Sequence, residues 1–270
     1  MPPISKSKGF TLVELVVVIT IVALLAAVST QLIRNPAQSF IDSENRANLT
    51  DRVDTALRRM SRDIHNALPN SVRNTTNGAD SFIEFIPVKS AGRYRAEVGS
   101  SVSDNPLDFS QTADTFDVLG PSVTIASGDK LVIYNLGIPG SDVYEGTNSR
   151  ALLTSGTLST LSFSGGTFPQ ASPSSRFYVA STPVTYACDM TNGVLLLYSG
   201  YAIQPTQPAS VATLNGLATA RKLASNLSFC QINYTSGILQ RSGVVTIYLG
   251  FAQDVANVKL MHQVNVVNSP

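Results

Sequence analysis

A long apolar stretch near the N-terminus constrains this chain more than any other feature. Residues 10–33 are apolar apart from small hydroxyls, Gln31 and the acid Glu14. As a helix rising about 1.5 Å per residue, the stretch spans the roughly 30 Å of bilayer hydrocarbon. Lys6 and Lys8 precede it, and such lysines keep their end of a membrane helix in the cytoplasm. The sequence therefore predicts a single-pass anchor with everything after Arg34 outside the cytoplasm.

Three kinds of anchor are possible: a cleaved secretory signal, a plain signal anchor, and an anchor in which Glu14 has a function. A cleaved secretory signal would have a shorter apolar core, and residues 26–29 offer only a weak version of its cleavage site. A plain signal anchor gives no reason for Glu14, because a carboxylate in hydrocarbon costs about 2.5–3.5 kcal/mol. We expect Glu14 to be paired or functional; the alternative is an acid tolerated near the membrane interface.

Residues 8–15, KGFTLVEL, resemble the signal of type IV prepilins and type II secretion pseudopilins. The resemblance implies that prepilin peptidase cleaves between Gly9 and Phe10, that the new Phe10 amine is N-methylated, and that the apolar helix is retained. It places the protein in the bacterial inner membrane, with its head in the periplasm, and then in a cell-surface pilus. A glutamate one helical turn from the new amine can pair with the amine of a neighbouring subunit. Glu14 is therefore expected to set axial register.

The second half of the predicted helix is amphipathic. Its apolar positions recur at helical spacing, which predicts a stripe packed under a sheet. The stripe comprises Leu49, Val53, Leu57, Met60, Ile64 and Leu68. Pro36 predicts an interruption, and Pro69 ends the pattern. We predict a cleaved leader (1–9), a transmembrane and assembly helix (10–35), an amphipathic second half (36–69) and a β-rich extracytoplasmic head (70–270).

The head has strand and loop composition. Strands are predicted at residues 82–88, 130–135, 176–180, 184–188, 194–201, 227–234, 244–251 and 258–267. Residues 91–120 and 137–175 are predicted to be long loops, and 214–227 a short helix or turn. The fold class is α+β: a long spine helix on a predominantly antiparallel sheet, as in type IV pilins.

Four further segments narrow the resemblance, at residues 60–72, 82–94, 176–189 and 262–268. They resemble minor pilins of MSHA pilus biogenesis, relatives of the J pseudopilin of type II secretion. The implied function is to prime pilus assembly at or near the tip. The implied partners are prepilin peptidase, other minor pilins, the major pilin and the inner-membrane assembly platform. Two alternatives remain open: a type II secretion pseudopilin at a pseudopilus tip, and a tip adhesin or ligand-binding module.

Cys188 and Cys230 lie far apart in strand-like segments. Their spacing fits one long-range disulfide in an oxidising compartment and excludes a CxxC metal or redox motif. Two separate buried thiols are the alternative.

The remaining side chains predict no enzyme, no cofactor and no metal. His65 and His262 lack HExxH or HxH company, and the glycine-rich turns lack the Lys-Ser/Thr of a phosphate loop. Asp129, Asp142 and Glu145 lack the spacing of an EF-hand. A formal net charge of +1 gives no field for nucleic acid, so no such partner is expected.

Overall fold

The computed structural model describes residues 9–270 except 102, 238–241, 254–255 and 269, and the side chains of residues 30–37 are not described. The chain forms two compact units, Met1–Asn48 and Leu49–Pro270. They are described separately below.

Helix α1 (Leu12–His65) passes through both units as one unbroken helix. The predicted interruption at Pro36 is therefore wrong: α1 continues through that position, although proline has no amide hydrogen to donate within the helix. Within the described residues, Leu12–Ser29 is the one helical segment long and apolar enough to span a membrane, with a mean hydropathy of 2.8. None of that segment is buried.

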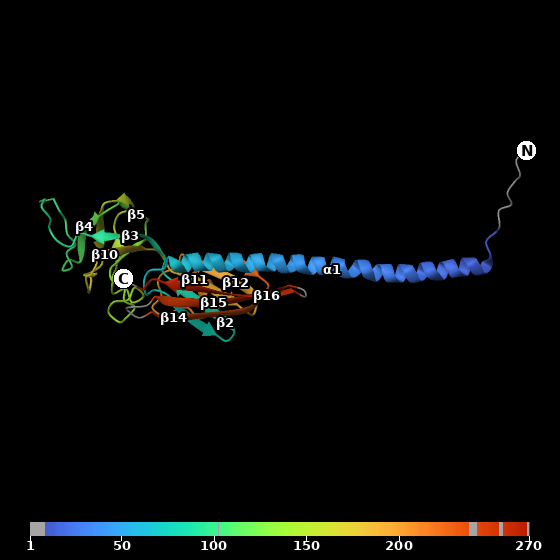
Figure 1. Ribbon diagram of the computed structural model, residues 1–270. Coiled ribbons are helices and arrows are strands. Elements are labelled where there is room, and N and C mark those ends of the chain that lie inside the picture. The colour runs from blue at the N-terminus through green and yellow to red at the C-terminus, as the bar shows by residue number, and fades with distance from the viewer. Residues whose placement is uncertain (1–8, 102, 238–241, 254–255, 269) are drawn as a thin grey trace, which may run out of the picture. The chain divides into compact units, whose positions relative to one another are not determined.

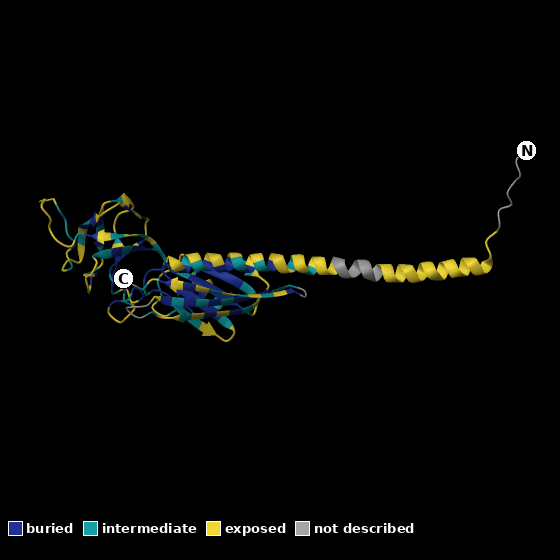
Figure 2. Ribbon diagram, in the orientation of Figure 1, coloured by how far each residue is buried: buried dark blue, intermediate teal, exposed yellow. Residues whose placement is uncertain are grey.

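The part of α1 in the second unit packs on two antiparallel sheets through the predicted apolar stripe (Figures 1 and 2). Leu49, Val53, Leu57, Met60 and Ile64 are all buried, which confirms the stripe. Burying such a side chain contributes about 1.5–3 kcal/mol. This stripe therefore fixes the second half of α1 to the head.

The two sheets are built from different parts of the chain: the first from strands of separate segments, the second from three consecutive strands near the C-terminus. The five-stranded sheet has the order β1 (Arg73–Asn77), β2 (Asp80–Phe85), β11 (Val184–Asp189), β12 (Val194–Ser199), β13 (Arg221–Ser225). The three-stranded sheet has the order β14 (Leu227–Thr235), β15 (Gly243–Gln253), β16 (Ala256–Val266). A short helix, α2 (Val211–Leu217), precedes β13. It overlaps only the start of the helix or turn predicted at 214–227, and residues 221–225 of that segment form the strand β13 instead. The predicted pilin-like plan of a spine helix on antiparallel strands is present.

A second group of strands closes into a small barrel beside the C-terminal end of α1 (Figure 1). Its order is β10 (Arg176–Ala180), β3 (Val88–Tyr94), β4 (Ala113–Leu119), β9 (Thr160–Ser164), β7 (Ser149–Leu152), β6 (Lys130–Val132). The strands β5 (Val123–Ile125) and β8 (Gly156–Leu158) form a separate pair. The barrel encloses its own aromatic core, which includes Tyr94, Phe116, Phe163 and Phe177.

The barrel corrects the prediction that residues 91–120 and 137–175 are long loops. These segments contribute β4, β7, β8 and β9, whose three to seven residues alternate too briefly for a recognisable pattern. The predicted strand at 82–88 also divides, because β2 ends at Phe85 and β3 begins at Val88, with Pro87 between them. A proline interrupts a strand because it has no amide hydrogen to donate.

A hydrogen-bonded junction connects the barrel to the end of α1. Asn70, in the left-handed region at φ 58°, donates to the carbonyl of Asn135 at 2.8 Å, and the Asn135 amide donates back to Pro69 at 2.7 Å. The hydroxyl of Tyr144 donates to the Ser71 carbonyl at 2.7 Å. These bonds link the segment after the helix to the barrel loops.

Candidate functional site: the N-terminal assembly helix

The start of α1 is defined by a side-chain cap. The backbone N–H of Glu14 donates to Oγ1 of Thr11 at 3.2 Å, and the N–H of Leu15 donates to the Thr11 carbonyl at 3.2 Å. Threonine at the N-cap with glutamate three residues later is the capping-box spacing. Sequence reasoning missed Thr11, although the T-x-x-E pattern before an apolar run was the available signal.

The predicted cleavage bond lies outside the helix, one residue before this cap. A Cβ atom built on Gly9 would meet no atom within 4 Å, so nothing in the described chain requires glycine there. Phe10 is 73% exposed. The need for a very small residue would therefore come from the peptidase. Residues 1–8 of the leader lie outside the described residues.

The Glu14 side chain is exposed in the first turn of α1. A negative charge there complements the positive end of the helix dipole. Around and after it lie many exposed large apolar side chains, such as Leu12 (79%) and Leu24 (68%). Apolar surface this continuous marks a region covered by lipid or by other proteins. This part of the helix thus presents one carboxylate on an exposed and mostly apolar surface.

Residues 4–30 match the family described as Prokaryotic N-terminal methylation motif. No curated protein and no solved structure matches the chain. The motif is the prepilin signal of type IV pilin-like proteins, and it implies processing by a prepilin peptidase and assembly with other pilins. The motif, the apolar helix and the β-rich head support the class of type IV pilin-like proteins and pseudopilins, anchored in the inner membrane.

The two cysteines lie within the head and are bonded to each other. Cys188 is on β11 and Cys230 on β14, with Cα atoms 6.3 Å apart. The bond therefore joins the five-stranded sheet to the three-stranded sheet under α1. Its formation in the exported protein stays a prediction.

The structure brings the two histidines to the same groove, between the end of α1 and β16. Nε2 of His262 lies 3.2 Å from Oγ of Ser61, and Nδ1 of His65 lies 3.4 Å from the carbonyl oxygen of Asn265. Both histidines thus make local contacts between α1 and β16.

The three loop acids do not converge. Asp129 pairs with Lys89 at 2.6 Å, Asp142 accepts from the backbone N–H of Tyr144, and Glu145 accepts from that of Gly140. Within the described ranges, no group of three or more His, Cys, Asp or Glu side chains could hold a metal ion.

Sequence reasoning missed a buried charge network in the head. Glu84 on β2 is fully buried and pairs with Arg73 at 2.6 Å. Its other oxygen accepts from the hydroxyls of Tyr201 at 3.0 Å and Thr185 at 3.3 Å. Burial and then the Glu84 charge raise the pKa of the Tyr201 hydroxyl. An acid inside the apolar run FIEF was the available signal.

Proposed function

We propose that this protein is a minor pilin of an MSHA-type pilus, resembling the MSHA pilus biogenesis protein MshO, and that it primes pilus assembly at or near the tip. The observation that carries the proposal is the prepilin signal on a helix whose apolar segment Leu12–Ser29 is entirely exposed. Its mechanism is packing without bond chemistry. The head waits in the periplasm until the subunit joins other minor pilins and the major pilin at the assembly platform.

Glu14 makes transfer of the helix from lipid to filament favourable. A carboxylate alone in hydrocarbon costs about 2.5–3.5 kcal/mol. A pair at about 4 Å, in surroundings of effective dielectric constant about 20, contributes about 4 kcal/mol. The N-methylated Phe10 amine of an adjacent subunit would supply this pair. The two effects are of similar size, so pairing with a neighbour's amine in the filament offsets the cost that the acid carries in lipid.

The shape of the head supports a terminal position. The barrel lies beside the C-terminal end of α1, beyond the sheets that the helix covers (Figure 1). In a filament of parallel spine helices, a domain in this place occupies space beyond the C-terminal end of α1 that a neighbouring subunit would otherwise need. A subunit with such a head is best accommodated at the end of the filament.

A Glu14→Ala variant tests the assembly mechanism. We expect it to be cleaved and methylated normally but to be lost from sheared pili, because the adjacent amine has no partner. Glu44→Ala removes an exposed acid further along the same helix and is the matched control. Normal incorporation of Glu14→Ala would contradict the mechanism.

Deletion of the gene tests the biological role. We expect a large loss of surface pili, restored by the gene in trans. Equal piliation with and without it would remove the priming role. If exoprotein secretion were lost instead, the protein would be a type II secretion pseudopilin, which has the same kind of N-terminal signal.

A ligand-binding role at the tip is a second candidate, favoured by one observation on the barrel. Arg93 on β3 and Arg176 on β10 are register partners, so two cations lie directly opposite each other. They line a hollow of about 370 Å³ together with Tyr178. Like charges at such positions are destabilising, and an anionic ligand would relieve them. Binding of acidic but not neutral glycans to the purified full-length protein would support this role; binding of neither would end it.

A further inference from the structure

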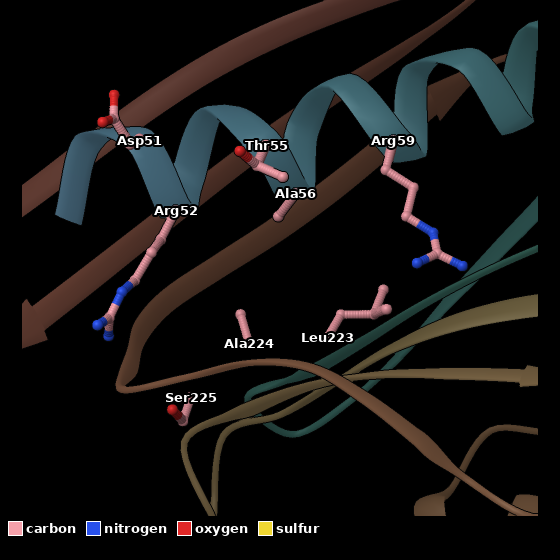
Figure 3. A pocket seen from close by; sticks show the side chains of 8 residues that line it. All are labelled: Asp51, Arg52, Thr55, Ala56, Arg59, Leu223, Ala224 and Ser225. Atoms are coloured by element: carbon pink, nitrogen blue, oxygen red, sulfur yellow. The ribbon is translucent and has the colours of Figure 1, made fainter. Parts of the chain in front are cut away.

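A groove runs between α1 and the edge strand β13 of the five-stranded sheet. Its volume is about 480 Å³. Figure 3 shows the side chains that line it: Asp51, Arg52, Thr55, Ala56, Arg59, Leu223, Ala224 and Ser225. The groove is separate from the N-terminal assembly helix, because all of its lining residues belong to the second compact unit.

One side of the groove is an open sheet edge. β13 is the last strand of its sheet, and among the described residues it pairs only with β12. A register shift opposite Leu195 and Leu196 brings both Leu223 and Ala224 against the core. The groove therefore combines unpaired backbone N–H and C=O groups with an apolar floor. An extended peptide that adds a strand requires both features.

The groove is also positively charged. Arg52 and Arg59 extend from α1 toward β13, whereas Asp51 points away from the strand (Figure 3). Arg221 on β13 is the register partner of Leu197, which is buried under α1. Register partners point to the same face of a sheet, so Arg221 is on the helix side too.

Few acidic side chains neutralise these three arginines. In the part of the chain that the structure describes, Arg52 and Arg221 form no ion pair. Arg59 lies 3.9 Å from Asp63, and that carboxylate also accepts a 2.5 Å hydrogen bond from Tyr186. Complementary charge steers partners and fixes the register in which they bind.

We propose that this groove binds an extended acidic segment of a neighbouring pilin-like subunit, which adds a strand to the edge of β13. The backbone of that segment pairs with β13, its apolar side chains cover Leu223 and Ala224, and its acids meet Arg52, Arg59 and Arg221. The charge favours a different chain over a second copy, because a β13 strand from another copy would bring more cations. The identification of the occupant as a subunit rests on the proposed function.

Site-specific photo-crosslinking in the native membrane tests the proposal on the full-length protein. A photo-reactive phenylalanine analogue replaces Ser225, which is exposed and lines the groove. The control replaces Leu217, which is exposed on α2 and lies outside the groove. We expect Ser225, but not Leu217, to capture an acidic peptide of another chain that has a prepilin signal, identified by mass spectrometry.

Charge reversal provides the second readout. Arg52→Glu with Arg59→Glu should lower the crosslink yield about tenfold. Arg58→Glu with Arg62→Glu makes the same charge change on the same helix outside this groove and should leave the yield within about twofold. A crosslink to a second copy, to lipid alone or to no protein would overturn the proposal, as would equal effects of the two pairs.

The N-terminal mass of the same samples separates the two claims. If Phe10 is methylated and the protein is assembled but Ser225 captures no subunit, the groove proposal fails and the proposed function stands. If the N-terminus is unprocessed, the proposed function fails, and with it the assignment of the occupant.

Discussion

Removing the Arg73 side chain should destabilise the head more than any exposed substitution. Two of its guanidinium nitrogens donate to Oε1 of Glu84, at 2.6 and 3.0 Å. The other contacts of the guanidinium are the carbonyls of Gln204 and Pro205, at 2.7 and 2.8 Å. The group also stacks on the ring of Tyr144, 3.6 Å from its centroid. Arg73 thus connects β1 and β2 to two loops.

The size of this destabilisation follows from the burial of Glu84, the ion-pair partner of Arg73. The Glu84 side chain has no exposed surface, whereas that of Arg73 is 20% exposed. In Arg73→Ala the carboxylate would keep only the hydroxyls of Thr185 and Tyr201 as donors. Breaking a buried pair by removing one partner costs about 3–5 kcal/mol, because an uncompensated charge remains. We therefore expect Arg73→Ala to lower the free energy of unfolding by about 3–5 kcal/mol.

Urea unfolding of the full-length protein in detergent measures this change. Near-ultraviolet circular dichroism of the nine tyrosines provides the signal, since the chain has no tryptophan. Arg58→Ala is the matched control: its 2.6 Å pair with Asp54 is exposed, with 78% of the Arg58 side chain accessible. Exposed pairs contribute about 0–1 kcal/mol.

A double variant tests the reasoning itself. Arg73→Ala with Glu84→Gln removes the orphaned charge, so it should be more stable than Arg73→Ala alone. The account would be refuted if Arg73→Ala cost no more than Arg58→Ala. It would also be refuted if the double variant were less stable than the single one.

Three further predictions concern the head. Arg93→Glu places an acid opposite Arg176 in the β3–β10 register and should raise the free energy of unfolding by about 0.5–1 kcal/mol in urea unfolding; unchanged stability would contradict this. Burial, as the largest effect, raises the pKa of Asp142, so the folded state favours its protonated form and stability falls as pH rises through that pKa. Asp142→Asn should therefore raise the melting temperature at pH 7, whereas near pH 3 the variant and the parent protein should melt at the same temperature. A higher melting temperature of the variant at pH 3 as well would show that the charge of Asp142 is not the cause. Cys188→Ser should cost about 3–4 kcal/mol through loss of the bond to Cys230 across 42 residues, a loss that a reducing agent should reproduce in the parent protein but not in the variant.

The helix and most strands of the sheets beneath it, β1 and β13 excepted, could be predicted because their patterns are local and long. The α1 stripe repeats over several turns, and β15 and β16 are each eleven residues long. The barrel could not be predicted in this way. Its strands are short, and its aromatic core joins side chains far apart in sequence, such as Tyr94 and Phe177. The residues next to Tyr94 or Phe177 in the sequence do not indicate that these two side chains share a core.

The same distinction applies to functional residues. Gly9, Phe10 and Glu14 belong to one short motif, so they could be proposed from sequence, and their roles stay predictions. Thr11 had an equally local signal that was not used. Glu84 also had a local signal, an acid inside the apolar run FIEF, but its partners Arg73, Thr185 and Tyr201 come from three separate segments and could not be predicted. The β13 groove likewise exists only once α1 lies beside the sheet edge.

The N-terminal mass of the membrane-purified protein, from cells with and without prepilin peptidase, tests the central claim most directly. The account predicts that the protein begins at an N-methylated Phe10 when the peptidase is present and retains its leader when the peptidase is absent. An intact Met1 in both strains, or a start after Ala27, would contradict it.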